Sequence, residues 1–408
     1  MKKNVLFVLF GATILLTMNA CKTDELDLDK ELKFSKLSVE EQKASIEQNG
    51  LDFVTAMEGM QDTKAMTTLM NMLERTSGEI VYAPMQRLVS DIKNGRQKAF
   101  SNFDKQMRVS YIDSEIWGEY SYNFTTEEME QVSTLTNKLI FNFPATESAT
   151  TNTAKITITY EESTVEVPDT EGELYPSKIT FVMTVAGAEV MTANFSGKYY
   201  SDGAPQEVTQ SLKMDTYEWT AEIKNDKKTA SESYEFKNGK TTLLKSVAEV
   251  NGTLTETELT AAIDAESPEN AINGFAVNFQ VMDVAIKGGT TNFKGFMTEG
   301  KALDSEKLTD KEYADKTAEI FNKYMVCTAY FVDANRKFAD VEFYTVEYID
   351  EYGYWDYQQQ KYIPQTYYDI APRFILSDDS KVAVEDYVME GFDEIINKIE
   401  DMENDFDY

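Results

Sequence analysis

The spacing of apolar residues is helical near the start of the folded part of the chain. Ser38-Val39-Glu40-Glu41 predicts a capping box, in which Ser38 accepts from the N–H of Glu41 and Glu41 reaches back to residue 38. A helix is expected to follow and to end at Asn49-Gly50, because Asn-Gly is a typical helix terminator. A second helix is predicted from Leu51 to about Gly59, and a third from about Met66 to Gly78.

Beyond about residue 107 the apolar residues alternate with polar ones, as in strands with one buried face. Asn238-Gly239 predicts a type I′ hairpin turn. Short strands separated by tight turns indicate an antiparallel meander, with one face apolar and the other rich in Thr, Glu and Lys. Strands are expected at about 109–113, 118–123, 139–144, 155–160, 179–185, 190–200, 217–224, 233–236 and 243–250.

Ser267-Pro268 suggests a boundary between 38–266, the N-terminal helices with the meander, and 267–408, a C-terminal α+β part. In the second part a strand-like segment at 274–286 is followed by a break at Gly288-Gly289, and Thr309 to Glu312 predicts another helix start. Hairpins are expected over 326–349 and 373–384, and a last helix over 385–403, with an apolar stripe. The predicted fold class is α+β: an antiparallel β-meander covered by the N-terminal helices and the C-terminal helix.

Composition excludes several classes of function. The chain has 71 acidic and 39 basic residues and a formal net charge of −32, which repels nucleic acid. It has no histidine, which excludes the usual Ser-His-Asp and Cys-His sites and His-containing metal sites. Cys327 lies in an apolar run, as expected of a buried small side chain. We therefore expect no enzyme activity, no cofactor and no metal.

The first residues have the features of an export signal. Lys2 and Lys3 precede an apolar run, Val5 to Leu16, which is too short to span a bilayer. The residues that follow, Thr17-Met18-Asn19-Ala20-Cys21, resemble the bacterial lipobox. This resemblance implies a signal peptide over 1–20, cleavage between Ala20 and Cys21, and lipid chains on Cys21 that anchor the protein in a bilayer. The competing interpretation is an ordinary secretory signal, or a retained N-terminal segment, with an incidental cysteine.

The segment 21–37 is interpreted as a lipidated N-terminus with an acidic tether. Its acidic start resembles the export tag of surface-exposed Bacteroidota lipoproteins, although a solvated spacer is an equally simple interpretation. The chain as a whole resembles uncharacterised lipoproteins of gut Bacteroidota. The motifs that carry this resemblance are Leu37 to Lys43, Lys138 to Pro144 and Glu390 to Ile396. The resemblance implies an outer-membrane location, at the cell surface or on the periplasmic face, and implies no activity.

The richest stretch in aromatic residues is Tyr344 to Tyr368. Sugar rings stack on aromatic faces while carboxylates accept from their hydroxyl groups, so the stretch is a candidate glycan-binding site. Two alternatives compete with glycan binding: a long hairpin loop whose tyrosines pack on the sheet, and a pair of carboxylates for glycoside hydrolysis. The candidate glycan-binding residues are Tyr348, Tyr352, Tyr354, Trp355 and Tyr357.

These patterns lead to one expected function and two alternatives. We expect a membrane-anchored, non-catalytic protein for binding or envelope interaction, whose protein partner the sequence does not name. The first alternative is a carrier of an apolar ligand in a half-barrel of sheet and helices, which predicts a large apolar cavity between them. The second is glycan binding by the aromatic stretch.

Overall fold

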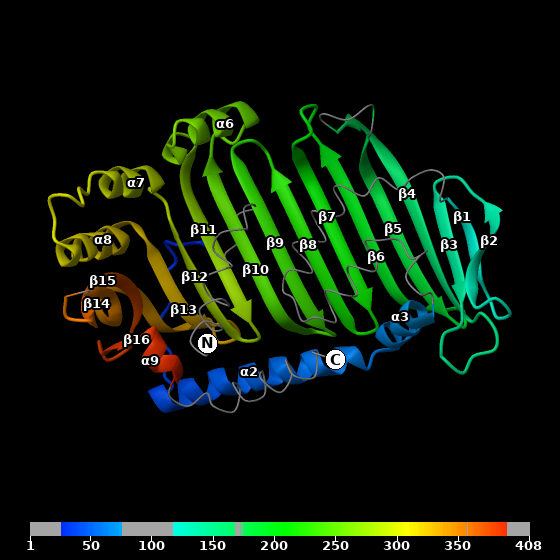
Figure 1. The fold of residues 1–408 in the computed structure, drawn as a ribbon, viewed down its shortest axis with the longest axis horizontal. Helices are drawn as coiled ribbons and strands as arrows, with labels where there is room; N and C mark the ends of the chain where they lie inside the picture. Colours follow the sequence, from blue (N-terminus) through cyan, green and yellow to red (C-terminus); the bar gives the residue numbers. More distant parts are fainter. Residues whose placement is uncertain (1–25, 76–116, 168–171, 173, 357, 390–408) are drawn as a thin grey trace. The chain divides into compact units, whose positions relative to one another are not determined.

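The computed structural model describes residues 26–75, 117–167, 172, 174–356 and 358–389. These residues form an α+β fold, and sixteen strands are hydrogen-bonded into one sheet in the order β16-β15-β14-β13-β12-β11-β10-β9-β8-β7-β6-β5-β4-β3-β1-β2 (Figure 1). The predicted fold class is therefore confirmed. Antiparallel neighbours dominate, whereas β1 and β3 run parallel. The signal segment, Cys21 and the strand predicted at 109–113 lie outside the described residues.

The strands are β1 (Gly118–Asn123), β2 (Glu128–Thr134), β3 (Lys138–Phe143), β4 (Ala154–Glu166), β5 (Leu174–Val185), β6 (Ala188–Tyr199), β7 (Pro205–Met214), β8 (Tyr217–Asn225), β9 (Thr229–Asn238), β10 (Thr241–Gly252), β11 (Ile272–Val281), β12 (Val284–Thr290), β13 (Val326–Phe331), β14 (Arg336–Asp356), β15 (Lys361–Ile375) and β16 (Lys381–Ala383). The helices are α2 (Val39–Gln61), α3 (Lys64–Arg75), α6 (Glu256–Asp264), the short 3-10 helix η3 (Pro268–Asn270), α7 (Phe293–Lys301), α8 (Asp310–Tyr324) and α9 (Val384–Met389).

The chain separates into two compact units. Unit 1 contains residues up to Asn49, Asn225–Glu232 and Ser246–Asp393, and unit 2 contains Gly50–Lys224 and Ser233–Lys245. The boundary suggested at Ser267-Pro268 falls inside unit 1, where Pro268 begins η3.

In unit 1, helices from both ends of the chain cover one face of β13–β15. The buried residues of this core are Ala329, Phe331, Phe338, Ala339, Phe374, Leu376 and Tyr387. Val39 and Ile46 of α2 pack against them, as does Val384 at the start of α9. The predicted cover of the sheet by N- and C-terminal helices is present in this unit.

The other face of the unit 1 sheet carries the segment Leu26–Leu37, here called the N-terminal strap. Leu32 packs on Ala285, whereas the neighbouring Val284 and Ile286 belong to the helix-covered core. Because side chains alternate between the faces of a strand, the strap and α2 lie on opposite faces of β12. The segment interpreted from the sequence as an acidic tether is therefore a packed layer from Leu26 onwards.

In unit 2 the second half of α2 and α3 are held to the sheet by polar contacts. The Tyr217 hydroxyl donates to the carbonyl of Ala56 at 2.6 Å, and the N–H of Ala65 donates to Asp215 at 3.1 Å. The Asn71 amide donates to the carbonyl of Pro144 at 2.7 Å. The apolar sheet face beside them contains stacked rings of Trp219 and Phe236, whose centroids are 4.2 Å apart.

Two local predictions about helix ends have opposite outcomes. The capping box at Ser38 is confirmed, because the N–H of Glu41 donates to Ser38 Oγ and the N–H of Ser38 donates to Glu41 Oε2. The predicted end at Asn49-Gly50 is wrong, because α2 continues through these residues. The Asn49 side chain donates to the carbonyl of Ser45 and accepts from the N–H of Asp283, so a tertiary contact occupies it within the helix.

Three further predictions need correction. The Asn238-Gly239 hairpin is present, but its turn residues are Gly239 and Lys240, of which only Gly239 has a positive φ, so the turn is not type I′. Strand β12 runs through Gly288-Gly289, where the sequence predicted a break. A Cβ atom on Gly289 would lie 2.1 Å from the carbonyl oxygen of Phe275, so glycine permits the close approach of β11 there. The stretch 344–368 is not a long loop, since most of it belongs to β14 and β15.

Candidate functional site: an aromatic β-arm

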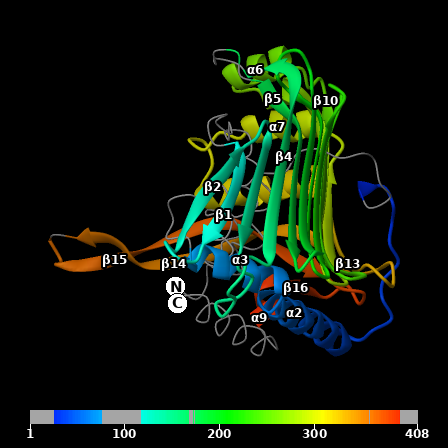
Figure 2. The ribbon, with the colours of Figure 1, turned by 90° about the vertical axis from the view of Figure 1, so that its right-hand side faces the viewer.

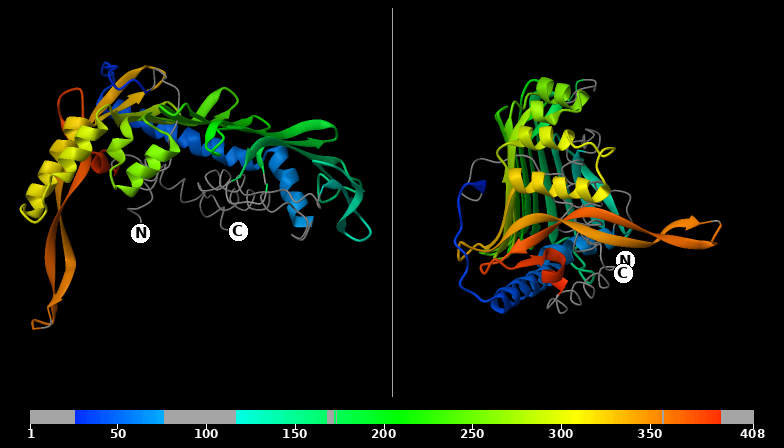
Figure 3. Two further views of the ribbon diagram at one scale, coloured as in Figure 1. Left: turned by 90° about the horizontal axis from the view of Figure 1, so that it is seen from above. Right: turned by 90° about the vertical axis from the view of Figure 1, so that its left-hand side faces the viewer.

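Strands β14 and β15 of unit 1 extend well beyond their neighbours in the sheet. Strand β13 pairs with β14 only as far as Asp340, and β16 pairs with β15 only over Arg373–Ile375. In the ladders of the described residues, β14 from Val341 onwards pairs with β15 alone. The outer part of this hairpin, Tyr348–Asp356 with Lys361–Tyr367, is here called the aromatic arm (Figures 2 and 3).

Helix α8 fixes the base of the arm. The Asn322 side chain donates to the carbonyl of Phe343 at 2.8 Å and accepts from its N–H at 2.7 Å, so it occupies the open edge of β14 as a neighbouring strand would. The Thr345 hydroxyl donates to Asp315 at 2.5 Å, and the rings of Phe321 and Phe343 lie 4.9 Å apart. These contacts hold the direction in which the hairpin leaves the sheet.

An ionic cluster reinforces the base. The Glu342 carboxylate pairs with Lys381 at 2.7 Å and with the Arg373 guanidinium, which also lies over the ring of Tyr344. Partial burial favours protonation of Glu342, but the hydrogen bonds from Lys381 and Arg373 outweigh it and lower the pKa of Glu342. The glutamate is therefore held as a carboxylate by partners on β15 and β16.

The arm itself exposes large apolar and aromatic side chains. Tyr352 is 71% exposed, Tyr348 and Tyr362 are each 49% exposed, and Ile349 is 60% exposed. Across the two strands the Tyr348 ring stacks on Tyr367 with centroids 5.7 Å apart, and Tyr352 meets Tyr362 edge-on at 5.4 Å. These cross-strand ring pairs hold the tyrosines on the arm and leave Tyr348, Tyr352 and Tyr362 exposed. Tyr362 and Tyr367 are five positions apart on β15, so the two pairs lie on opposite faces of the arm.

Tyr352 lies in an irregularity of the β14–β15 ladder. Between Asp350 and Tyr354 the pairing with β15 shifts, and β14 carries two extra residues there. The N–H of Tyr352 donates to the Asp350 carboxylate at 2.9 Å, which braces the irregular backbone. Tyr352 therefore has no partner in the backbone ladder, and it is 71% exposed.

The structure brings together only part of the predicted site. Tyr348 and Tyr352 both lie on the arm, and the register pairs Tyr354 with Ile363 and Trp355 with Tyr362. The side chains of Tyr354 and Trp355, and all of Tyr357, lie outside the described part of the structure. Tyr362 and Tyr367 were not among the predicted site residues. They are identified by the pairing of β14 with β15, which the sequence analysis did not predict for this stretch.

Glu347 and Asp350, two acidic side chains of the hairpin, are engaged locally. The Tyr368 hydroxyl donates to Glu347 at 3.1 Å, and this hydrogen bond raises the pKa of Tyr368. Asp350 accepts from the backbone of Tyr352. The arm is thus a projecting ridge with aromatic faces, suited to stacking against a chain of rings rather than to enclosing a small molecule.

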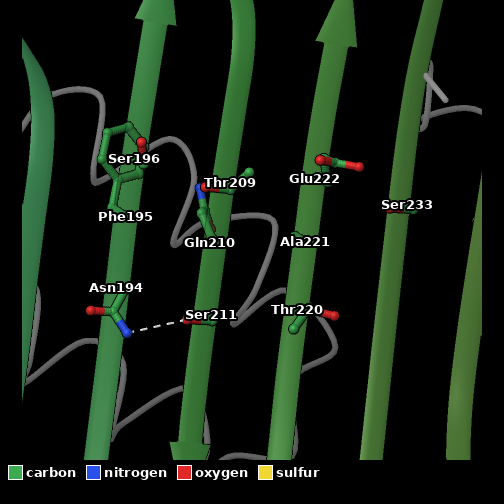
Figure 4. A pocket seen from close by; sticks show the side chains of 10 residues that line it. All are labelled: Asn194, Phe195, Ser196, Thr209, Gln210, Ser211, Thr220, Ala221, Glu222 and Ser233. Carbon is green, nitrogen blue, oxygen red and sulfur yellow. Dashed lines mark hydrogen bonds between the residues drawn. The ribbon is translucent and has the colours of Figure 1, made fainter. Parts of the chain in front are cut away.

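A shallow depression of about 360 Å³ lies on the polar sheet face of unit 2 (Figure 4). Asn194 and Ser196 of β6, Thr209 and Ser211 of β7, and Thr220 and Glu222 of β8 share this face. The Asn194 amide donates to Ser211 at 3.4 Å. The depression is an open bed of hydroxyl, amide and carboxylate groups.

A second depression, of about 460 Å³, lies in unit 1 beside the end of the strap. Ser35, Lys36 and Leu37 form one wall, and Asp283 and Arg336 contribute to the other. Burial raises the pKa of Asp283. Both depressions are open to solvent, so neither is the enclosed apolar cavity that the carrier interpretation predicted.

The described residues offer no strong candidate for a reactive thiol, a metal site or a membrane-spanning helix. Burial raises the pKa of the Cys327 thiol to about 12, so it is protonated at neutral pH and a poor nucleophile. Among the described residues no group of His, Cys, Asp or Glu is arranged to hold a metal ion. No helix in the described ranges is both long and apolar enough to cross a membrane.

Comparison with known proteins adds no assignment. No protein-family model, no curated protein and no solved structure matches the chain. The function must therefore be argued from the geometry above.

Proposed function

We propose that this protein is a lipid-anchored, non-catalytic binding protein of the outer membrane, and that the aromatic arm is its binding element for neutral polysaccharides. The observation that carries the proposal is the two cross-strand tyrosine pairs of the arm, in which Tyr348, Tyr352 and Tyr362 are 49–71% exposed. Exposed aromatic rings on a two-stranded support match the apolar faces of sugar rings in a polymer.

The charge of the arm favours neutral ligands over acidic ones. It carries Asp350, Glu351 and Asp356 against one base, Lys361, which is a net charge of −2. The whole chain carries −32. An acidic polysaccharide would be repelled at close range, whereas a neutral one would meet rings and hydrogen-bond acceptors.

Binding of immobilised polysaccharides by purified full-length protein tests this role. Neutral polysaccharides are expected to retain the protein, and acidic ones are expected to retain it less. Tyr352→Ala combined with Tyr348→Ala is expected to weaken binding by about 10- to 100-fold, because each stacking contact contributes about 0.5–1.5 kcal/mol beyond its buried area. Tyr313→Ala is the matched control, since Tyr313 is a 39% exposed tyrosine of α8 outside the arm.

Three outcomes would contradict the proposal. The first is failure to retain the protein on any neutral polysaccharide, and the second is equal binding by the double variant and the control. The third is release of new reducing ends from a bound polysaccharide, which would show catalysis and remove the non-catalytic assignment.

The anchor is tested separately from the arm. Cys21→Ser is expected to abolish palmitate incorporation and to move the protein from the membrane fraction to the soluble fraction, because two or more acyl chains are needed for stable anchoring. A Cys21→Ser variant that still takes up palmitate would contradict lipidation at this residue.

A further inference from the structure

The N-terminal strap is attached to unit 1 by side chains spaced along its length. Leu26 is 5% exposed and packs with Val247 and Ala276, and Leu32 is 6% exposed and packs with Ala285 and Tyr330. These contacts lie on β10, β11, β12 and β13. The strap therefore crosses several neighbouring strands on one sheet face.

Polar contacts also hold the strap. Lys287 is 4% exposed, and its ammonium donates to the carbonyls of Asp27 at 2.8 Å and Lys30 at 3.3 Å. At the other end the N–H of Lys337 donates to the carbonyl of Lys33, and its carbonyl accepts from the N–H of Ser35. Without the strap Lys287 would lose both carbonyl partners, so the segment belongs to the folded unit.

The strap leaves a very short connection to the expected anchor. Cys21 and Leu26 are five residues apart, so the chain between them reaches at most about 18 Å even when fully extended. We propose that the strap orients unit 1 on the membrane, so that its strap-bearing sheet face meets the lipid headgroups and the aromatic arm points away from them. This inference rests on lipidation of Cys21, which is part of the proposed function.

The charge of the strap suits this position. Leu26–Leu37 contains three acids, Asp27, Asp29 and Glu31, and three bases, Lys30, Lys33 and Lys36, so its net charge is zero. The chain as a whole carries −32 and would be repelled by an anionic surface. A neutral layer on the side nearest the anchor lowers that repulsion.

Within unit 1 the arm leaves the sheet on the side opposite the strap, as the side view of Figure 2 and both views of Figure 3 show. The nine residues Tyr348–Asp356 span about 30 Å as an extended strand. An anchor at the strap and a binding ridge on the opposite side would present the tyrosines to polymers in the medium rather than to headgroups.

Energy transfer to the membrane surface tests the orientation. Acylated full-length protein is reconstituted in phosphatidylcholine vesicles that carry a headgroup-labelled acceptor lipid, with a donor dye on one introduced cysteine. Ala334→Cys lies beside the strap, where Ala334 lines a depression together with Ser35–Leu37. Lys361→Cys is an exposed site at the end of the arm. Protein without an introduced cysteine measures labelling of Cys327, which is expected to be slow because its thiol pKa is about 12.

Transfer from Ala334→Cys is expected to be several-fold more efficient than transfer from Lys361→Cys. Leu26→Ser combined with Leu32→Ser is expected to release the strap and to remove this difference, because the reach from Cys21 to Val39 is then about 60 Å. Leu37→Ser is the control, since Leu37 is a strap leucine that is already 41% exposed.

Equal transfer from the two sites, or greater transfer from Lys361→Cys, in protein that incorporates palmitate would overturn the orientation and leave the anchor intact. Absence of palmitate would overturn the anchor and the orientation together. Polysaccharide binding is measured in a separate assay, so its failure is distinguishable from either result.

Discussion

The inner and outer parts of the β14–β15 hairpin share the same two strands but differ in their surroundings. In the inner part Phe338 is 2% exposed and Phe374 is 4% exposed, within a core completed by Tyr387 of α9. In the outer part Tyr352 is 71% exposed. One continuous hairpin therefore passes from a covered sheet to an uncovered ribbon.

The inner part of the hairpin contributes stability, whereas the outer part presents side chains at the surface. A two-stranded hairpin alone is marginally stable in water, so the arm depends on its inner part for alignment. The inner part obtains cover from α2, α8 and α9, and its side chains are constrained by packing. In the outer part Tyr348, Tyr352 and Tyr362 contact rings across the two strands and remain 49–71% exposed, which leaves part of their aromatic surface for a ligand.

The largest expected effect on stability is in the inner part. Phe338→Ala is expected to lower the free energy of unfolding by about 3–5 kcal/mol, because it removes a ring that contacts Phe331 and Phe374 and leaves a cavity. Urea unfolding followed by circular dichroism measures this change. A loss below about 1 kcal/mol would show that the inner part is not the stabilising half.

A smaller effect is expected from the helix that supports the base of the arm. Thr309 caps α8 in a full capping box with Glu312, so Thr309→Ala is expected to cost about 1 kcal/mol. Thr317→Ala is the control, since the Thr317 hydroxyl donates to the carbonyl of Tyr313 inside the same helix. Equal losses from the two variants in urea unfolding would argue against the cap.

The ionic cluster at the base predicts a dependence of stability on pH. The folded-state pKa of Glu342 is lowered, so its contribution is present above the unfolded pKa and is lost as the pH falls below about 4.5. Glu342→Gln is expected to remove about 1 kcal/mol at pH 7 and less at pH 3. Unfolding of both proteins at the two pH values measures this. An equal loss of unfolding free energy at pH 3 and pH 7 would show that the charge of the Glu342 carboxylate does not contribute to stability. Glu319→Gln on α8 is the control variant.

The smallest change in stability is expected in the arm. Tyr352→Ala is expected to alter the free energy of unfolding by about 0.5 kcal/mol or less, as at other exposed sites. Tyr348→Ala should cost slightly more, because the Tyr348 ring stacks on Tyr367. Thermal melting measures both variants, and a loss comparable with that of Phe338→Ala would remove the distinction between the two parts of the hairpin.

Short-range features of the structure were predicted correctly from the sequence. The alternation of Ile179 to Val185, the capping box at Ser38, the helix start at Thr309 and the hairpin over Asp333–Arg336 all appear in the structure. Each depends on residues a few positions apart, whose side-chain alternation or capping hydrogen bonds are local. Of the candidate site, Tyr348 and Tyr352 were found from composition alone.

Features that depend on partners distant in the sequence could not be predicted from it. Asn49 continues a helix because its side chain accepts a hydrogen bond from the N–H of Asp283. The strap packs on the sheet because Leu32 contacts Ala285 and Tyr330 and because Lys287 donates to a strap carbonyl. The aromatic stretch becomes an arm because β13 and β16 end early, so no neighbouring strand covers it. Local sequence determines where strands and caps form, since their hydrogen bonds and side-chain alternation are local. Only the tertiary structure decides which faces are covered and which tyrosines remain exposed, because burial depends on partners that lie up to hundreds of residues away.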